Sequence, residues 1–316
     1  MTAASPSHLP IRHLLLALAV VAVWGTNFVV IRLALGVLPP LVFATLRFTL
    51  AFLPCALFVK RPAVPWSSLA AYGVLIGAGQ FGLLFIAMDG HISPGLASLV
   101  VQSQVFFTIG LAMAFAGERV RWFQIAALVL ATAGIGIILF HGDRSATPLG
   151  LALVIGAAMS WAGGNHVAKA SGTTDMLAFV IWSSMFAVPP LALAALVLEG
   201  WPAIATAVTH MGPGAWAAVV WQTVGNTLFG YVAWGWLLAR HPAATVTPMA
   251  MLVPVFGMGA SALLLGESLP VWKLGAAALV MSGLALNLLW PLAARLPGGS
   301  VPPAYLPEIS PAASGE

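Results

Sequence analysis

The sequence predicts an all-α integral membrane protein, and two observations carry this prediction. Of 316 residues, 61% are hydrophobic and 6% are charged, against about 25% charged residues in soluble domains. The apolar residues also gather in runs of about 20, the length that a helix needs to cross the hydrocarbon core of a bilayer. A water-soluble fold is thereby excluded. The net charge of +4 comes from scattered side chains and not from a basic stripe, so nucleic-acid binding is not expected.

Ten membrane-spanning helices are expected, joined by short connections of which 199–212 is the longest. They cover residues 12–35, 40–59, 68–89, 93–115, 121–140, 148–170, 175–198, 213–238, 242–265 and 271–290. The first apolar run is longer than a signal-peptide core, so we expect it to be retained as a helix. Outside the spans lie an N-terminal segment (1–11), a linker (141–147) and a tail (291–316) whose composition predicts disorder.

The distribution of Lys and Arg predicts the orientation. With the N-terminus in the cytoplasm, three basic residues fall outside, namely Arg32, Arg144 and Lys273. Eight fall inside: Arg12, Lys60, Arg61, Arg119, Arg121, Lys169, Arg240 and Arg295. Because cytoplasmic loops carry an excess of Lys and Arg, both termini are expected in the cytoplasm.

The two halves of the chain repeat one another. The segment FFTIGLAMAFAGE, which starts at Phe106, has a counterpart in VFGMGASALLLGE, with Phe107, Gly110, Gly117 and Glu118 matching Phe256, Gly259, Gly266 and Glu267 at a spacing of 149 residues. The same spacing carries Gly134 onto Gly283. Each half, 12–140 and 148–290, holds five predicted spans. Because five is odd, the second half enters the membrane from the opposite side, which predicts two inverted five-helix repeats of the kind common in secondary transporters.

Polar or bulky aromatic residues near the middle of several spans predict a central cavity. They are Thr26, Asn27, Gln80, Gln102, Gln104, Trp161, Asn165, Trp221, Gln222 and Asn226. Asn and Gln can simply join neighbouring helices by hydrogen bonds. However, five different spans contribute amides or hydroxyls at one depth, which favours a substrate-binding cavity. Amides both donate and accept, and indole rings attract a cation, so this set suits a zwitterion.

Four segments resemble the EamA-type branch of the drug/metabolite transporter superfamily. They are WGTNFVVIRLAL from Trp24, LRF at Leu46, PGLASLVVQSQVFFTIGLAMAFAGER from Pro94 and MLVPVFGMGASALLLGES from Met251. The resemblance runs from about Arg12 to Trp290 and is strongest to bacterial amino-acid and amino-acid-metabolite exporters of the YddG type. It implies a ten-helix inner-membrane exporter whose cavity is lined mainly by spans 1, 3, 4, 6, 8 and 9.

Several polar residues have structural interpretations that we favour. Arg47 is expected to pair with Asp89, with direct binding of a substrate carboxylate as the alternative, and His166 is expected to pack rather than to titrate. Glu118 and Glu267 are expected to cap or join repeat-related helix ends. Gly73 and Gly77 predict close helix packing. Pro248, Pro254 and the pair Gly163–Gly164 can break or kink their helices.

The predicted function is export of neutral amino acids, including aromatic ones, and related small metabolites by alternating access. Residues 12–35 contain no carboxylate, unlike the first helix of the small multidrug relatives, so obligatory ion coupling is not expected. A proton-coupled drug or metabolite exporter is one alternative. Another is a membrane enzyme acting on a lipid-linked substrate through His91, Asp89, His210 and Glu199, although these residues show no metal-ligand or nucleophile–base spacing. The expected partners are a small-molecule substrate and membrane lipids, with no cofactor or metal, and a monomer and a homodimer both remain open.

Overall fold

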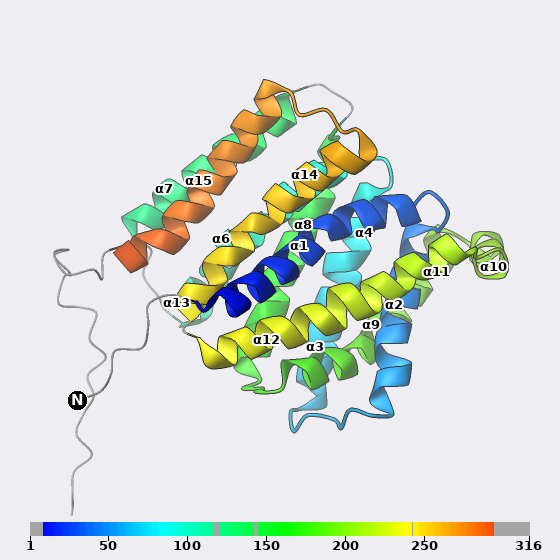
Figure 1. The fold of residues 1–316 in the computed structure, drawn as a ribbon. Coiled ribbons are helices and arrows are strands. Elements are labelled where there is room, and N and C mark those ends of the chain that lie inside the picture. The colour runs from blue at the N-terminus through cyan, green and yellow to red at the C-terminus, as the bar shows by residue number, and fades with distance from the viewer. Residues whose placement is uncertain (1–8, 117–120, 142–144, 242, 294–316) are drawn as a thin grey trace, which may run out of the picture.

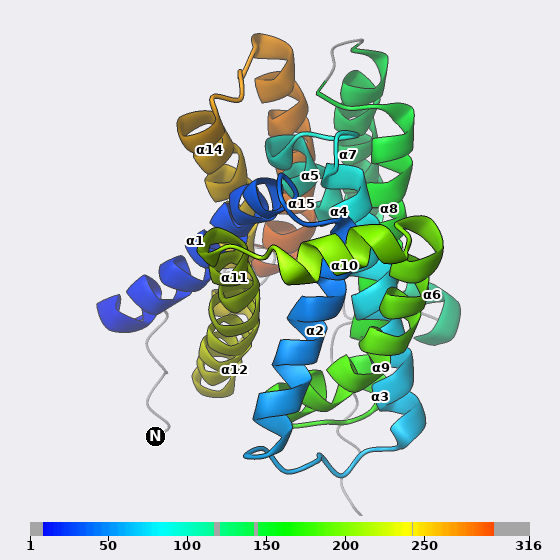
Figure 2. The same ribbon diagram turned by 90° about the vertical axis from the view of Figure 1, so that its right-hand side faces the viewer.

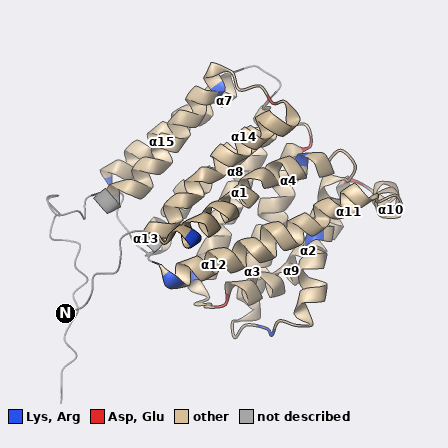
Figure 3. Cartoon of the chain, in the orientation of Figure 1, with Lys and Arg blue, Asp and Glu red and all other residues tan. Residues whose placement is uncertain are grey.

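The fold is built from helices throughout the described part of the chain. The computed structural model describes residues 9–116, 121–141, 145–241 and 243–293, where the only strand-like pairing is an isolated bridge between Ile92 and Ala146. Within these described ranges, eight helices are long and apolar enough to cross a membrane: Ile11–Ala34, Trp66–Met88, Pro94–Phe115, Trp122–Phe140, Pro148–Ala170, Met176–Leu198, Thr247–Leu265 and Val271–Trp290. The predicted all-α membrane class is confirmed. The ribbon in Figure 3 shows that most positions of charged residues lie at helix ends and connections.

Two of the predicted spans take a different form. α2 (Pro40–Ala56) is an apolar helix of 17 residues. The expected loop 199–212 contains a short helix, α10 (Trp201–Thr209), and the chain then turns by 99° into the helical stretch Pro213–Arg240 (Figure 2). If this bent pair is one span, the long apolar helices number up to nine among the described residues. The arrangement of ten spans therefore stays a prediction.

Helix starts follow from local sequence. Proline occupies the first turn where α2, α5 (Pro94–Val100), α8 (Pro148–Ala170) and α11 (Pro213–Val220) begin, a position at which its missing N–H costs nothing. Ser93, Thr147 and Asp175 cap α5, α8 and α9 (Met176–Leu198) by accepting a hydrogen bond from the backbone three residues on. α14 (Val253–Leu265) ends at Gly266, whose φ of 69° favours glycine.

Four spans are interrupted by segments that are not α-helical. Nine-residue π-helical segments lie between α3 (Trp66–Gly73) and α4 (Leu83–Met88), as η1 (Val74–Gly82), and between α11 and α12 (Gly230–Arg240), as η3 (Trp221–Phe229). Two 3₁₀ segments are η2 (Val101–Ser103), before α6 (Gln104–Ala116), and η4 (Thr247–Leu252), between α13 (Ala243–Val246) and α14. Each π segment thus has a counterpart in the other half of the chain, and so does each 3₁₀ segment. π-Helical turns occur frequently at functional sites.

The most extensive helix contacts join the first half of the chain to the second. α1 (Ile11–Ala34) packs on α14, α2 packs on α9, and η1 packs on α8. α7 (Trp122–Phe140) lies along α15 (Val271–Ala293), and Figure 1 shows this pair side by side. The two halves therefore interleave and do not form separate globules.

The contact between α7 and α15 is reciprocal. A Cβ atom at Gly134 would lie 2.8 Å from the Ala276 carbonyl oxygen, and one at Gly283 would lie 2.5 Å from the Ala127 carbonyl oxygen. The spacing of 149 residues that relates Gly134 to Gly283 also relates Ala127 to Ala276. Such an exchange, in which each surface contacts the equivalent of itself, is the mark of a two-fold interface.

The predicted close packing at Gly73 and Gly77 is confirmed. A Cβ atom at Gly73 would lie 3.1 Å from Phe186 Cβ, and one at Gly77 would lie 3.0 Å from Ala187 Cα, both on α9. Pro248 lies in the 3₁₀ segment η4 and Pro254 in the first turn of α14. Gly163–Gly164 does not break its helix, because α8 continues unbroken to Ala170.

Candidate functional site

A cavity of about 470 Å³ lies between the two halves of the chain. This volume is within the range of about 300–1,000 Å³ that is usual for small-molecule sites. Seven of the ten residues predicted for the site line it: Asn27, Gln80, Gln102, Gln104, Trp161, Asn165 and Asn226. Whether they bind a substrate stays a prediction, but the structure brings their side chains to one place.

All four non-α-helical segments reach this cavity. η1 supplies Gln80 and Phe81, η3 supplies Asn226, η2 supplies Gln102, and η4 supplies Ala250. An irregular helix leaves some backbone groups without their usual partners, which is tolerated in a membrane only against protein or a cavity. The site is therefore built where both halves depart from regular α-helix.

Hydrogen bonds already occupy part of the polar lining. Asn165 Nδ2 donates to Gln104 Oε1 at 3.4 Å, and Gln102 Nε2 donates to the Ala250 carbonyl oxygen at 3.5 Å. Asn27 differs from these residues, because its Oδ1 is buried with no partner among the described residues. Since an unsatisfied buried acceptor costs about 1–3 kcal/mol, Asn27 is suited to receive a donor from a ligand.

An aromatic cluster formed by Trp24, Tyr231 and Trp234 closes one side of the cavity. The ring of Trp24 lies 6.3 Å from that of Tyr231 and 5.3 Å from that of Trp234, measured between centroids. Trp24 Nε1 donates to the Asn226 carbonyl oxygen at 3.2 Å, which joins α1 to the π-helical segment η3. The rings offer apolar area and faces that attract cations.

Three predicted site residues lie elsewhere. The Thr26 hydroxyl donates to the Ala22 carbonyl oxygen of its own helix at 2.7 Å, and the side chain is not in the cavity lining. Gln222 is fully buried outside the cavity, and its amide oxygen and nitrogen have no partner among the described residues. Depth along a span does not give the direction of a side chain, and neither of these side chains belongs to the cavity lining.

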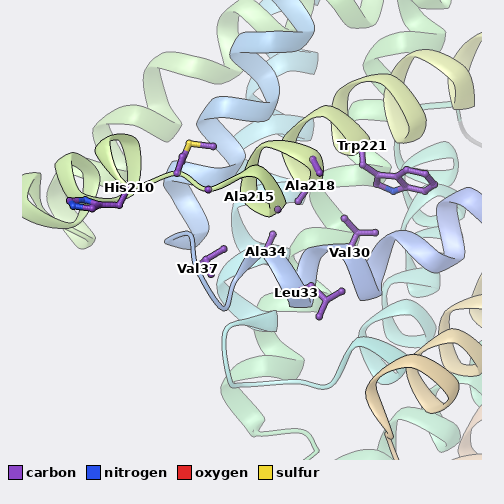
Figure 4. Close-up of a pocket in the computed structure, with 12 residues that line it drawn as sticks. Val30, Leu33, Ala34, Val37, His210, Ala215, Ala218 and Trp221 are labelled. Atoms are coloured by element: carbon purple, nitrogen blue, oxygen red, sulfur yellow. The ribbon is translucent and has the colours of Figure 1, made fainter.

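The third, Trp221, lines a different hollow. This groove, of about 650 Å³, lies between the C-terminal part of α1 and α11. Figure 4 shows Val30, Leu33, Ala34 and Val37 opposite Ala215 and Ala218, with His210 and Trp221 at its two ends. Most of its lining is apolar, and Leu33 and Val37 are exposed on the outside of the bundle. The groove lacks the converging polar groups of the smaller cavity, so we place the functional site in the latter.

The cavity also contains residues from spans that were not expected to reach it. Arg47 comes from α2, Met176 from α9 and Asn287 from α15. The expected pair of Arg47 and Asp89 is wrong: Arg47 Nη2 donates to Thr227 Oγ1 at 3.1 Å, and Lys273 with Glu267 forms the one ion pair seen between described residues. The depth of Arg47 in an apolar span was a signal for the cavity, whereas nothing in the sequence separates Asn287 from a lipid-facing amide.

Glu267 joins helix ends, as predicted. It accepts hydrogen bonds from Ser93 Oγ at 2.5 Å, from the Gly95 N–H at 3.1 Å and from Ser261 Oγ, and it pairs with Lys273 at 3.2 Å. Burial alone would raise the pKa of Glu267, but these donors and the Lys273 charge outweigh burial and lower it. Its repeat partner Glu118 lies outside the described residues.

Two of the four residues considered for an enzymatic site, Glu199 and His210, make contacts at helix ends. Glu199 accepts from the Leu41 and Val42 N–H groups at 2.6 and 3.1 Å, which caps α2. His210 contacts Thr209 and Thr206 of its own helix.

The ring of His166 lies 5.0 Å from that of Phe115 and outside the cavity lining, as expected for a packing residue. No group of three His, Cys, Asp or Glu side chains among the described residues is arranged to hold a metal.

Comparison with known proteins places the chain in a family. The model of the EamA-like transporter family matches residues 11–140 and again 148–289. A probable amino-acid metabolite efflux pump of Salmonella typhimurium and its namesake in Escherichia coli are each 39% identical over 280 residues, which is 86% of this chain and 93% of theirs. A probable terminal-alkyne amino-acid exporter of Streptantibioticus cattleyicolor is 27% identical over 84% of this chain and 90% of its own. One crystal structure, at 18% identity, superposes with a TM-score of 0.57 over 91% of this chain and all of the other, a likeness of fold alone. The chain belongs to the EamA-like transporter family and is a multi-pass membrane transporter, not an enzyme.

Proposed function

We propose that this transporter exports amino acids and related small metabolites across the bacterial inner membrane. The observation that carries the proposal is the amide- and indole-lined cavity where the irregular segments of both halves meet. The names of the relatives, efflux pumps for amino-acid metabolites and an amino-acid exporter, support this substrate class. The name of an inner membrane transporter of Escherichia coli, 29% identical over 54% of this chain, supports the location. The seven lining residues named above are the proposed substrate contacts.

Alternating access between two inverted five-helix repeats is the proposed mechanism. The reciprocal contact of α7 with α15, the matching π-helical segments η1 and η3, and the two matches of the family model, at 11–140 and 148–289, support the repeats. In this mechanism the halves rock against each other and expose the cavity to each side in turn.

Transport is proposed to follow the substrate gradient without obligatory ion coupling. A proton- or sodium-coupled carrier usually keeps a carboxylate near the membrane centre, and no Asp or Glu occurs among the described residues of the cavity lining. We expect downhill flux of L-phenylalanine in proteoliposomes without any imposed pH or sodium gradient. Uphill accumulation driven by either gradient would favour a proton- or sodium-coupled exporter instead.

The orientation with both termini in the cytoplasm is also proposed, on the charge distribution of the sequence. In a variant without Cys55, single cysteines near Lys60 and Arg121 are expected to react with impermeant reagents from the cytoplasmic side, and a cysteine near Lys273 from the other side. The opposite labelling pattern would reverse the orientation.

Substitutions in the cavity test the site directly. Asn27→Ala and Trp161→Ala are expected to lower phenylalanine flux by about tenfold, since each removes a group that contacts the substrate, worth about 1–3 kcal/mol. The matched control is Trp66→Ala, because Trp66 is 48% exposed at the start of α3 and should change flux less than about twofold. Flux per folded transporter is the measurement. Equal losses of flux in all three variants would show that the cavity is not the substrate-binding site.

A further inference from the structure

Arg47 is a buried cation without a counter-ion in the described part of the cavity. Its side chain is 2% exposed and belongs to the cavity lining. No other described lining residue carries a charge, and the carboxylates of Glu199 and Glu267 are engaged at helix ends. A guanidinium at membrane depth is costly unless something compensates its charge, so it marks a functional site by default.

The protein satisfies this guanidinium only in part. Of its five N–H donors, one is used at Thr227 Oγ1, while Nε and Nη1 have no partner among the described residues. The guanidinium carbon lies 3.5 Å from the centre of the Phe81 ring, and such a contact recovers part of the lost hydration but none of the missing hydrogen bonds. The unused donors match the planar oxygens of a carboxylate.

The position of Arg47 links it to both halves of the cavity. Thr227 belongs to the π-helical segment η3 and Phe81 to the π-helical segment η1. The Thr223 hydroxyl of η3 also donates to the Arg47 carbonyl oxygen at 3.3 Å. A ligand that draws the guanidinium away from Thr227 therefore acts on a contact between α2 and η3 and on another between α2 and η1.

We propose that Arg47 binds the carboxylate of the substrate, while the Trp24–Tyr231–Trp234 cluster receives its ammonium or apolar part. The inference rests on the proposed transport of amino acids and specifies how the same cavity selects them. Nε and Nη1 are covered in this conformation, so binding requires the side chain to swing from Thr227 towards the cavity. The ligand then supplies the negative charge that the lining lacks, and a neutral amide of the same shape does not.

The test compares ligands that differ only in the carboxylate. Binding of 3-phenylpropionate and of 3-phenylpropionamide to the full-length protein in detergent is followed by quenching of the indole fluorescence. The wild-type protein is expected to bind the carboxylate at least about tenfold more tightly than the amide. In Arg47→Gln the carboxylate should lose this advantage, with its affinity falling about tenfold or more and that of the amide changing less than about twofold. Arg47→Lys keeps the charge but not the planar fork of donors. Its affinity for the carboxylate should lie between those of the wild-type protein and Arg47→Gln.

Two further measurements test whether Arg47 itself causes the preference for the carboxylate. If Arg47→Gln fails to fold, Thr227→Val serves instead, because it removes the present partner of the guanidinium and should keep or increase the preference for the carboxylate. A wild-type protein that prefers neither ligand, or an Arg47→Gln variant that loses both equally, would overturn the role of Arg47. Absence of amino-acid flux in proteoliposomes, with the carboxylate preference intact, would instead overturn the proposed function.

Discussion

Replacing Glu267 by Gln is expected to lower the free energy of unfolding by about 3–5 kcal/mol, because it leaves a buried charge unpaired. That charge is Lys273, which is 2% exposed and has Glu267 as its ion-pair partner. The same change weakens the hydrogen bonds that Glu267 accepts from Ser93 and Gly95 at the start of α5. Unfolding in detergent by heat or by denaturant measures the loss.

The double variant Glu267→Gln/Lys273→Gln separates charge from packing. Because it removes both members of the pair, it should be more stable than Glu267→Gln alone. Lys169→Gln, at an exposed lysine near the end of α8, is the control and should change stability by less than about 0.5 kcal/mol. A double variant as unstable as the single one would show that the hydrogen bonds, and not the ion pair, carry the effect.

The stability that Glu267 provides should depend on pH. Its pKa in the folded state lies below the ordinary value of 4.5, so the folded protein holds the ionised form more strongly than the unfolded chain does. The contribution is therefore complete above pH 4.5 and is lost as the pH falls through the lower folded value. The difference in melting temperature between the wild-type protein and Glu267→Gln should narrow over that range and stay constant from pH 6 to pH 8.

Gly257→Val is expected to reduce transport by about tenfold or more and to cost about 1–3 kcal/mol of stability through overpacking. Gly257 lies where α14 meets two other helices: a Cβ atom there would be 2.6 Å from Ser98 Cβ on α5 and 3.5 Å from the Gly25 carbonyl oxygen on α1. Ser98 is fully buried and its hydroxyl donates to the Gly95 carbonyl oxygen at 2.7 Å, so it has little room to move. Separating α1 from α14 would also shift Trp24 and Asn27 in the cavity wall.

The matched control is Gly259→Val, two residues further along the same helix. A Cβ atom at Gly259 meets nothing within 4 Å, so this variant has the same helix-propensity change without the clash. Its flux should stay within about twofold of wild type, and its melting temperature should change little. Similar losses at both positions would attribute the effect to valine in a helix and not to the crossing of α1, α5 and α14.

Much of the helical framework could be predicted from the sequence, because the thickness of the bilayer sets the length of the apolar runs and charged residues are largely excluded from its core. The close approach at Gly73 and Gly77 was also accessible, since small residues four apart allow helices to meet. The π-helical segments were not, because Val74–Gly82 and Trp221–Phe229 carry no proline and no pattern that separates them from ordinary apolar helix. Helix α10 was missed because its nine residues look like a connection.

Seven of the ten candidate site residues line the cavity, but the sequence did not show in which direction each side chain points. Asn27 and Thr26 are adjacent on α1, yet one faces the cavity and the other bonds to its own backbone. Which face of a helix meets the cavity is fixed by packing against other helices, and a π-helical turn changes that face within one span. Within η3, Asn226 lines the cavity while Gln222, four residues earlier, does not.

The interleaving of the two halves bears on how the protein is made. Synthesis delivers residues up to Phe140 to the membrane before α14, α9 and α8 exist, and these are the helices that α1, α2 and η1 contact most extensively. Before α14, α9 and α8 are inserted, the bilayer already contains Asn27, Arg47 and Gln80. These residues then lack the neighbours that they have in the folded protein. The first half is thus inserted without its most extensive helix contacts, which can form only once the second half has been translated.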